Sequence, residues 1–368
     1  MSQVKKKVYV GLSGGVDSAV SAGLLKEQGF NVTGVFIKIW SPEWINCTAK
    51  EDRLDAMRVC ATLDIPYKEL DLSEEYKKQV VQNMIDEYKS GRTPNPDVLC
   101  NKEIKFGKFF DFAMREGADY VATGHYSRIE TIRQIPNNKK QITNKFRLLR
   151  GRDKNKDQSY FLWAIKKEQL SKILFPIGDL EKTEVRKLAK KFGLRQATKK
   201  DSQGLCFIGH LDIKDFLSNY IKPRRGDVLN NENEIIGYHN GVEFLTIGER
   251  HGFVIDKKTP NDKPYFVTSK NIEKNTIVVS NEKESIENPA LVGVAQIKDI
   301  NWLKRPSEDE ILECRLYYRA QLLSVKIKFN KNDITLVNVI FNKPAMPVSG
   351  QSIVFYKNEV CIGGGILV

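Results

Sequence analysis

The chain has 368 residues, of which 41% are hydrophobic, and a formal net charge of +13. This length allows two or three domains with real cores, and no apolar run approaches the roughly 20 residues of a membrane-spanning helix, so we expect no membrane association. The charge favours a polyanionic partner, nucleic acid first, although lysines spread over every surface would give the same sum. The first residues lead directly into an apolar segment without a signal or transit peptide, which predicts a cytoplasmic protein.

Apolar runs alternate with helical patterns over about the first 200 residues. We expect strands at 8–12, 31–37, 67–72 and 120–123. We expect helices at 17–28, 50–63, 74–89, 101–116, 166–174 and 181–192. Such alternation predicts βαβ units and a parallel sheet with helices on both faces. The polar segment 131–145 is expected to form an exposed hairpin or loop.

The residue pattern changes after about residue 210, where short strand-like segments lie between Gly, Pro and Asn residues. Alternating segments then predict a small antiparallel β-barrel, with strands at 290–296, 312–318, 324–329, 334–341, 352–356 and 360–362. The fold class is therefore α/β. We expect a Rossmann-like parallel-sheet adenylation domain over 1–209, a small central domain over 210–279 and a C-terminal β-barrel over 280–368.

The most informative motif is the loop at 11–18, Gly-Leu-Ser-Gly-Gly-Val-Asp-Ser, between the first expected strand and the first expected helix. Its two glycines permit a backbone path that a Cβ would obstruct. Successive N–H groups of such a loop and of the helix N-terminus form a positive, concave anion site. The Gly-Lys-Ser/Thr ending of a Walker loop and the Gly-x-Gly-x-x-Gly fingerprint are both absent. The loop therefore predicts a phosphate or pyrophosphate site, and an ordinary Gly-rich turn is the alternative.

Loop 91–100 is the second candidate site, because two prolines stiffen it and an Asn or Asp can cap a helix that begins near residue 101. Cys100 would then lie at a helix N-terminus with Lys102 and Lys105 nearby, and the dipole and the cations favour the thiolate. Asp97, three residues earlier, is placed to move protons. The alternative is a buried, inert cysteine in a capped helix.

Cys206 is the third candidate, since it follows a polar, Gly-containing turn; here too a small buried thiol is the alternative. The six cysteines are scattered and none forms a Cys-x-x-Cys pair, which argues against zinc-ribbon and many iron–sulfur sites. We therefore expect no metal bound by protein ligands alone.

These features, in this order, closely resemble the bacterial tRNA-specific 2-thiouridylase family of pyrophosphatase-loop enzymes. The resemblance spans nearly the whole chain. It rests on Ser-Gly-Gly-Val-Asp-Ser at 13–18, Asn-Pro-Asp-x-x-Cys at 95–100, Thr-Gly-His-Tyr at 123–126, Lys-Asp-Gln-Ser-Tyr at 156–160, Ser-x-Gly-x-Cys-Phe at 202–207, Thr-Ile-Gly at 246–248, Tyr-Arg at 318–319, Gln-Ser-x-Val-Phe-Tyr at 351–356 and Gly-Gly-Gly at 363–365.

The resemblance implies ATP-dependent 2-thiolation of the wobble uridine in tRNA anticodons. ATP, with Mg²⁺, adenylates the C2 oxygen and pyrophosphate leaves. Sulfur carried as a persulfide on Cys206 then replaces that oxygen, giving 2-thiouridine and AMP. The resemblance also implies that Cys100 is a nucleophile that can close a transient disulfide with Cys206, and that Asp97 is the acid/base residue. The implied partners are the tRNA anticodon region and a persulfide donor such as a cysteine desulfurase or a sulfur-relay protein.

The same resemblance assigns binding residues. For ATP these are Gly11, Leu12, Ser13, Gly14, Gly15, Val16, Asp17, Ser18, Ile37 and Gly124. For the target base and the tRNA they are Asn95, Pro96, Asp97, His125, Lys156, Asp157, Gln158, Tyr317, Tyr318 and Gln351.

Two positions depart from the family pattern. Tyr317 stands where an Arg is expected, and an aromatic ring there stacks on a base instead of pairing with a phosphate. Ile37 stands where Met is usual, which keeps an apolar contact with adenine. Three rival functions remain: a pyrophosphatase-loop ligase acting on a small metabolite, a sulfur-independent tRNA ligase, and an RNA-binding protein with a vestigial nucleotide site. The intact loop, the two cysteines and the basic C-terminal part favour the thiolase.

Overall fold

The computed structural model describes residues 5–44, 49–134, 143–200, 212–256, 263–281, 290–330 and 333–368. The N-terminal part contains a five-stranded parallel sheet in the order β3-β2-β1-β4-β7. Its strands are β1 (Lys7–Leu12), β2 (Asn31–Lys38), β3 (Tyr67–Asp71), β4 (Tyr120–Ala122) and β7 (Ile173–Leu174). The parallel sheet expected from the alternating pattern is confirmed.

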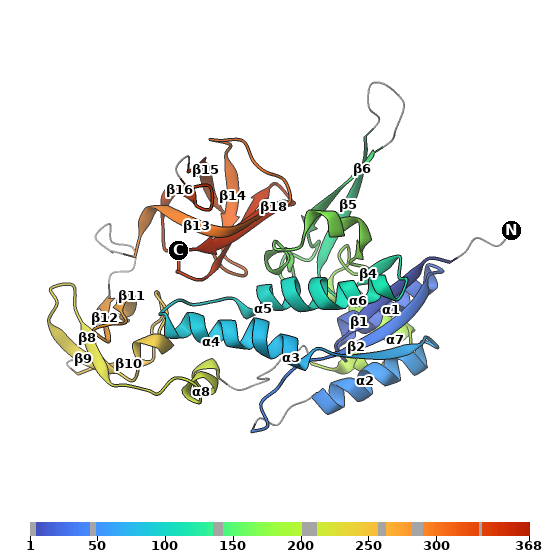
Figure 1. Cartoon of the computed structure of the whole chain (residues 1–368), viewed down its shortest axis with the longest axis horizontal. Coiled ribbons are helices and arrows are strands. Elements are labelled where there is room, and N and C mark those ends of the chain that lie inside the picture. Colours follow the sequence, from blue (N-terminus) through green and yellow to red (C-terminus); the bar gives the residue numbers. More distant parts are fainter. Residues whose placement is uncertain are drawn as a thin grey trace.

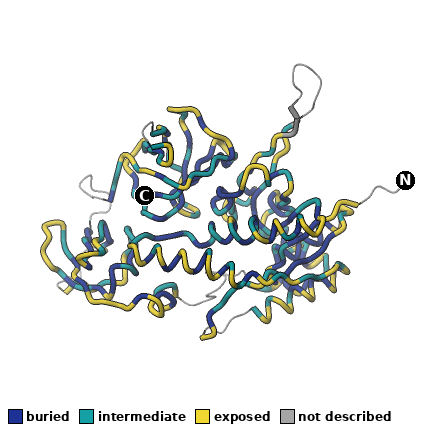
Figure 2. Tube along the Cα trace, viewed as in Figure 1, coloured by how far each residue is buried: buried dark blue, intermediate teal, exposed yellow. Residues whose placement is uncertain are grey.

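Helices cover both faces of this sheet, because alternate residues of each strand point to opposite sides. Val8 and Val10 of β1 pack with α1 (Val16–Glu27), α2 (Ala49–Thr62) and α7 (Lys182–Lys191). Tyr9, between them, faces a second core that includes Phe106 and Phe109. Buried residues follow the inner faces of the layers, while the outer face of α2 is exposed (Figure 2).

Two long helices on the second face are each built from three joined pieces (Figure 1). The first runs through α3 (Ser73–Tyr76), a π-helical segment (Lys77–Val81) and α4 (Gln82–Lys89), and it extends from the sheet towards the central domain. The second runs through α5 (Pro96–Leu99), a π-helical segment (Cys100–Phe109) and α6 (Phe110–Arg115). π-Helical turns are rare and are often found at functional sites.

The central domain contains a second, mixed sheet in the order β10-β9-β8-β12-β11. Its elements are α8 (Ile213–Ser218), β8 (Gly226–Leu229), β9 (Ile235–His239), β10 (Phe253–Ile255), β11 (Phe266–Asn271) and β12 (Thr276–Ser280). It lies at the end of α4 that is remote from the parallel sheet (Figure 1).

The C-terminal part is a six-stranded antiparallel barrel, which confirms the expected architecture. It is closed by pairing of the first strand with the last. The strands are β13 (Val292–Trp302), β14 (Leu312–Arg315), β15 (Leu323–Phe329), β16 (Val337–Ala345), β17 (Ser352–Lys357) and β18 (Val360–Leu367). β18 extends beyond the expected 360–362 through three glycines at 363–365, where the neighbouring strands leave no room for a Cβ. A Cβ at Gly363 would lie 2.2 Å from the Asn301 carbonyl oxygen.

A hairpin of the N-terminal part extends the barrel sheet. The strands β5 (Ser127–Gln134) and β6 (Thr143–Arg150) pair with each other, as the expected hairpin requires, and β6 then pairs with β18. The barrel is thus joined to the parallel-sheet domain by backbone hydrogen bonds. The helix expected at 166–174 is a 3₁₀ helix (Lys167–Lys172) that ends earlier, because Ile173 and Leu174 form β7, which completes the edge of the parallel sheet. Within the described residues, no helix is long and apolar enough to cross a bilayer.

Candidate functional site

The loop between β1 and α1 curls around the N-terminus of α1. Gly14 has φ +71, and a Cβ there would lie 2.7 Å from the Asp52 carbonyl oxygen. Gly15 is the N-cap of α1 and supplies no side-chain cap. The Ser13 backbone N–H donates to Ser18 Oγ at 3.2 Å, which fixes the turn. The positive end of the helix therefore faces the loop, which is the geometry of an anion site.

Asp17, in the first turn of α1, is held by two residues that sequence reasoning missed. Tyr126 Oη donates to Asp17 Oδ1 at 2.8 Å. Lys182 Nζ, at the start of α7, donates to both carboxylate oxygens at 2.8 Å. A lysine ammonium thus stands beside the phosphate-type loop. Nothing in the local sequence of α7 points to this role, because Lys182 is 165 residues from Asp17.

A second lysine fastens the loop from the other side. Lys199 Nζ donates to the Gly14 carbonyl oxygen at 3.2 Å and to carboxylate oxygens of Asp52 and Asp55, both at 2.8 Å. Asp52 and Asp55 belong to α2, so Lys199 ties the loop to that helix. The left-handed Gly14 is therefore supported by a specific ion-pair network.

The ten residues assigned to ATP by resemblance are brought together at one edge of the sheet. Gly11 and Leu12 end β1, residues 13–18 form the loop after it and the first turn of α1, Ile37 lies near the end of β2 and Gly124 follows β4. In the strand order β3-β2-β1-β4, the chain passes from β1 to β2 and β3 on one side of β1 and then continues with β4 on the other side. Ligands of such sheets bind beyond the carboxyl ends of the strands, at the place where this direction changes. A Cβ at Gly124 would lie 2.5 Å from the Ser18 backbone nitrogen, so only glycine fits against α1.

The helix that carries Cys100 begins earlier than the sequence predicted. Asn95 is the N-cap, since its side chain accepts from the Val98 N–H at 3.3 Å, and Pro96 is the first helical residue. The expected start near residue 101 is therefore wrong, and Cys100 is buried in the second turn. The helix dipole acts mainly within the first turn, so it favours the Cys100 thiolate less than expected. Asn95 and Asp97 occupy the helix start instead.

Asp97 is a candidate proton carrier on physical grounds. Burial raises the pKa of Asp97 above its ordinary value, and the charge of Lys105 opposes that rise. A raised pKa keeps the proton available closer to neutral pH, which suits general acid/base chemistry.

Lys105 is oriented in turn by His125. Lys105 Nζ donates to His125 Nε2 at 3.4 Å, so His125 Nδ1 carries the proton and donates to Thr123 Oγ1 at 2.7 Å. Burial, and secondarily Lys105, hold the pKa of His125 well below its usual range. The ring is only 6% exposed and packs against Phe106 and Phe175. The structure thus places His125 in the interior beside Gly124, and its contact with tRNA stays a prediction.

Comparisons with known proteins identify the family of the chain. Three family models match in succession: a tRNA methyl transferase HUP domain over residues 6–210, a tRNA methyl transferase PRC-barrel domain over 214–281 and an aminomethyltransferase beta-barrel domain over 294–367. A tRNA-specific 2-thiouridylase MnmA of Halalkalibacterium halodurans is 43% identical over 98% of this chain and 94% of that relative. The MnmA of Salmonella paratyphi B is 43% identical over 100% of this chain and 98% of its own length. The chain belongs to the tRNA-specific 2-thiouridylase family.

Among solved structures, a U34-tRNA thiolase NcsA from Methanococcus maripaludis is similar at a TM-score of 0.36 and 18% identity. The match covers 59% of this chain and 66% of the other.

The positions that the family resemblance assigns to tRNA lie in different environments. Asp157 is buried: its carboxylate bonds Arg315 Nη1 at 2.9 Å and Arg150 Nε at 3.2 Å. Both carboxylate oxygens face inward and have partners within the protein, and the contact of Asp157 with tRNA stays a prediction. Its neighbours Lys156 and Gln158 are only partly buried. Gln158 Oε1 accepts from the Tyr126 N–H at 3.0 Å, which links this segment to the nucleotide site.

The remaining assigned residues lie on the barrel. Tyr317 is 60% exposed, whereas Tyr318 packs against Phe161 with ring centroids 4.5 Å apart. Gln351 Nε2 donates to the Pro94 carbonyl oxygen at 3.3 Å, next to Asn95. Cys206 lies outside the described residues. Among the residues that are described, no group of three or more His, Cys, Asp or Glu could hold a metal ion.

Replacing Asp97 by Asn should stabilise the protein at alkaline pH. The pKa of Asp97 is raised by folding, so its contribution to stability is fully present below the unfolded pKa, about 3.9, and is lost as pH rises through the folded pKa. Asn cannot ionise, so Asp97→Asn should be more stable than wild type in urea at pH 8, and the difference should shrink towards pH 4.

Asp119→Asn is the matched control. The Lys7 N–H and the Lys6 ammonium lower the pKa of Asp119, so its substitution should change stability in the opposite direction at pH 8. A variant Asp97→Asn that is less stable than wild type at pH 8 would refute the raised pKa.

Proposed function

We propose that the chain catalyses ATP-dependent 2-thiolation of the wobble uridine in tRNA anticodons. The observation that carries the proposal is a shared wall between the two candidate sites. Phe109, on the helix that carries Cys100, packs close to Gly11 of the nucleotide loop: a Cβ added at Gly11 would be 3.3 Å from the Phe109 ring. Lys105 of the same helix reaches His125, the residue after Gly124. ATP and a reactive thiol would therefore meet at one edge of the sheet.

The first step is activation of the base. The C2 oxygen of uridine is a poor leaving group. It attacks the α-phosphate of ATP, the bond to the β-phosphate breaks and pyrophosphate leaves. The target nucleotide must be unstacked to reach the site, and single-stranded anticodon bases are the least costly to extrude. The N–H groups of the 11–18 loop and the Lys182 ammonium stabilise the negative charge on the phosphates.

Magnesium would arrive with the nucleotide. Mg²⁺ is typically held by one or two carboxylates together with substrate phosphates, and it neutralises charge on the leaving pyrophosphate. Asp17 is the carboxylate at the loop that fits this role. Its present partners, Tyr126 and Lys182, keep it oriented towards the N-terminus of α1.

The second step transfers sulfur. The terminal sulfur of a persulfide on Cys206 forms a bond to C2 as the bond from C2 to the AMP oxygen breaks. The Cys100 thiolate then attacks Cys206 Sγ, which closes a Cys100–Cys206 disulfide and leaves 2-thiouridine. Asp97, three residues before Cys100 on the same helix, accepts the thiol proton. A persulfide donor reloads Cys206 after a thiol reductant opens the disulfide.

Nucleoside mass spectrometry tests this proposal directly. The purified protein is incubated with unmodified tRNA, ATP, Mg²⁺ and a persulfide donor, and nucleosides and AMP are quantified. We expect 2-thiouridine and AMP in equal amounts. A sulfur-independent tRNA ligase would give AMP and a modified uridine without sulfur. A ligase for a small metabolite would give AMP only with that metabolite, and an RNA-binding protein would give neither product.

Asp17→Ala should lower tRNA-dependent pyrophosphate release by on the order of 10²-fold. The substitution removes the carboxylate at the loop and frees the Lys182 ammonium from its partner, so both the metal ligand and the fixed charge are disturbed. Pyrophosphate release with saturating tRNA is the measurement. Asp64→Ala is the control, since Asp64 pairs with Lys26 at the surface, away from this loop. Wild-type release by Asp17→Ala would exclude the assigned nucleotide site.

A further inference from the structure

Glu249 of the central domain bonds two segments that come from different parts of the chain. Lys214 Nζ, in α8, donates to Glu249 Oε1, and the Thr246 N–H donates to Glu249 Oε2 at 2.9 Å. His251 Nδ1 lies 3.1 Å from Oε1. One carboxylate therefore holds α8 with one oxygen and the loop that begins at Thr246 with the other.

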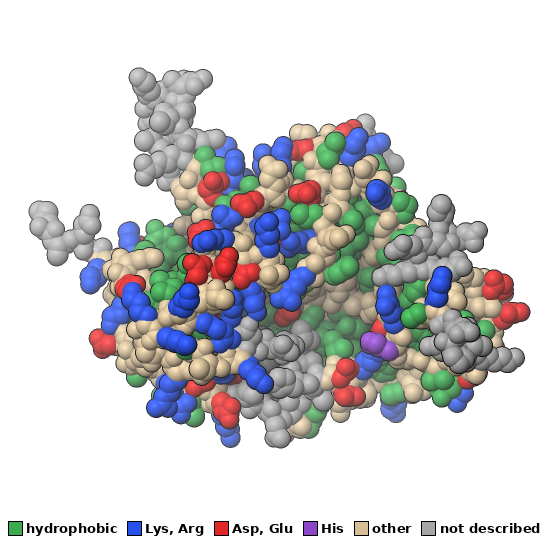
Figure 3. Space-filling model, turned by 180° about the vertical axis from the view of Figure 1, so that it is seen from behind, with side chains coloured by type: hydrophobic (Ala, Val, Ile, Leu, Met, Phe, Trp, Pro, Cys, Tyr) green, Lys and Arg blue, Asp and Glu red, His purple; other side chains and the backbone are tan. Residues whose placement is uncertain are grey.

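This ion pair differs from the charges of the outer surface. Lys and Arg side chains are spread over the surface seen in Figure 3, and exposed ion pairs contribute little to stability. The side chain of Glu249 is only 13% exposed and that of Lys214 30%. A Cβ added at Gly252 would lie 2.6 Å from Lys214 Nζ, so the glycine leaves the space in which the ammonium reaches the carboxylate. Because water is partly excluded, the attraction between the two charges is stronger than on the surface.

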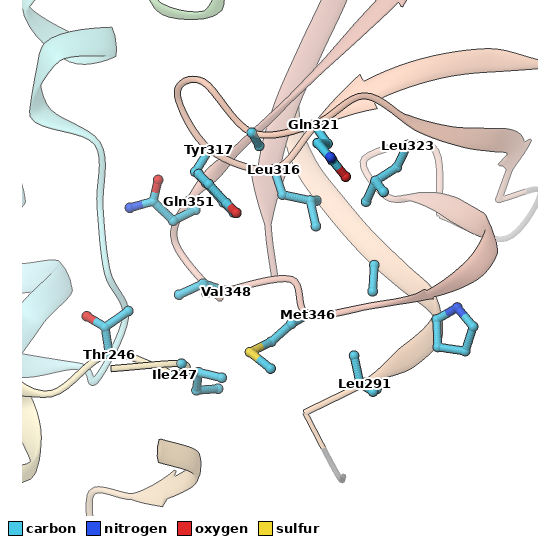
Figure 4. A pocket seen from close by; sticks show the side chains of 14 residues that line it. Thr246, Ile247, Leu291, Leu316, Tyr317, Gln321, Leu323, Met346, Val348 and Gln351 are labelled. Carbon is cyan, nitrogen blue, oxygen red and sulfur yellow. The ribbon is translucent and has the colours of Figure 1, made fainter. Parts of the chain in front are cut away.

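The Thr246 end of this link reaches the start of the helix that carries Cys100. Thr246 Oγ1 lies 3.1 Å from Thr93 Oγ1, which belongs to the segment that runs past Thr246 in Figure 4. Thr93 is buried, and two residues later Asn95 caps the Cys100 helix. A displacement of the Thr246 loop would therefore move the segment that leads into the helix cap.

The Lys214 end of the link holds α8, which begins a few residues after Cys206 in the sequence. Phe216 and Leu217 of α8 are fully buried, and they belong to the apolar cluster that also contains Cys100. Apolar packing is not directional, so by itself it leaves the orientation of a short helix weakly fixed. The bond from Lys214 to the carboxylate supplies the missing direction.

We propose that Glu249 is a positioning residue, which fixes α8 relative to the Cys100 helix and so aligns the groups that transfer sulfur. It acts through Lys214 and Thr246 and not on the reacting atoms. The role rests on the proposed function for the reaction, whereas the link itself can be measured in the protein without substrates. Activation of the base by ATP should not depend on Glu249, because the loop at 11–18 is held by other side chains.

The first test separates sulfur transfer from activation. Glu249→Ala should lower single-turnover 2-thiouridine formation by on the order of 10²-fold at saturating RNA and persulfide donor, because a small misplacement of reacting groups has an effect of that size. Its tRNA-dependent pyrophosphate release should stay within about twofold of wild type, since the nucleotide loop is a separate site. Glu249→Gln should recover part of the thiolation rate, because its amide oxygen still accepts one of the two hydrogen bonds.

Two further variants show whether the pair acts as one link. Lys214→Met should lower thiolation by less than Glu249→Ala does, and the double variant should be no slower than Glu249→Ala, because the bond to α8 is already gone. Glu234→Ala is the matched control: Glu234 Oε2 accepts from Asn230 Nδ2 at 2.9 Å in an exposed turn of the same domain, so neither step should change. Losses that multiply in the double variant, wild-type thiolation by Glu249→Ala, or pyrophosphate release that falls as far as thiolation would overturn the positioning role.

Hydrogen exchange of the full-length protein without substrates measures the link itself. Glu249→Ala should speed exchange of the backbone amides of α8 and also of Val98 and Leu99, which bond Asn95 at the far end of the link. Glu234→Ala should change neither segment. Unchanged exchange in either segment of Glu249→Ala would show that Glu249 does not join them. If exchange changes as expected but wild type makes no 2-thiouridine on intact tRNA, the proposed function fails alone.

Discussion

Cys206→Ser and Cys100→Ser should each lower 2-thiouridine formation by on the order of 10³-fold or more, because a covalent sulfur relay has no substitute for either thiol. A serine at 206 cannot carry sulfane sulfur. A serine at 100 cannot attack Cys206 Sγ and break its bond to the sulfur attached to C2, since a serine hydroxyl is scarcely ionised at neutral pH. Single-turnover thiolation with a preloaded persulfide donor is the measurement.

The two variants should keep the earlier step. Adenylation uses the loop at 11–18 and precedes sulfur transfer, so tRNA-dependent pyrophosphate release should persist in Cys206→Ser. Peptide mapping of wild type after one turnover should find a Cys100–Cys206 disulfide or a persulfide on Cys206. Thiolation by Cys206→Ser with a physiological persulfide donor would contradict the relay.

Other cysteines serve as internal controls. Burial raises the pKa of Cys60 to about 11, and that of Cys314 and of Cys361 to about 12, so their thiols stay protonated and unreactive. Cys60→Ala and Cys314→Ala should therefore retain thiolation, within the limits of any loss of stability. Ala is preferred to Ser at these sites because it buries no unpaired hydroxyl.

Local sequence patterns were sufficient to predict the conformation of the loop at 11–18. Its glycines, its serines and the flanking strand and helix all lie within one short stretch, and the structure places Gly14 at a positive φ as such a turn requires. The alternation of strands and helices likewise gave the parallel sheet, because burial of each element follows its own periodicity. What a residue does within its own turn or strand is readable from its neighbours.

The partners of that loop were not predictable in the same way. Lys182 and Lys199 reach Asp17 and Gly14 across 165 and 185 positions, and a surface lysine at the start of a helix looks the same in sequence. The pairing of β6 with β18 likewise joins two domains that sequence alone treats separately. The helix start at Pro96 was missed because the two prolines were interpreted as a stiff loop, whereas proline is favoured at the first helical position.

Asp157 belongs to a motif of the family resemblance, and its contacts within the protein give it a structural role. Its carboxylate is 1% exposed and the paired Arg315 side chain 7%. The other oxygen accepts the N–H groups of Gly151 and Ser159 at 3.0 and 3.1 Å. Arg315 ends β14 and Arg150 ends β6, so one carboxylate joins the barrel to the hairpin of the N-terminal domain. Removing the barrel by truncation would therefore expose this buried junction instead of leaving an intact nucleotide domain.

Asp157→Ala should lower the free energy of unfolding by about 3–5 kcal/mol, since it leaves the buried Arg315 guanidinium without its carboxylate. That is a large share of the roughly 5–15 kcal/mol of a typical domain. The urea midpoint is the measurement. Asp179→Ala is the control, because Asp179 pairs with Arg128 at the surface at 3.6 Å and should cost about 1 kcal/mol or less.

A second variant separates the lost pairing from other damage. Asp157→Leu combined with Arg315→Met removes both charges, so it should recover much of the stability that Asp157→Ala loses. It should still leave Gly151 and Ser159 without an acceptor, so recovery should be incomplete. If Asp157→Ala unfolds at the same urea concentration as Asp179→Ala, the buried pair does not hold the two domains together.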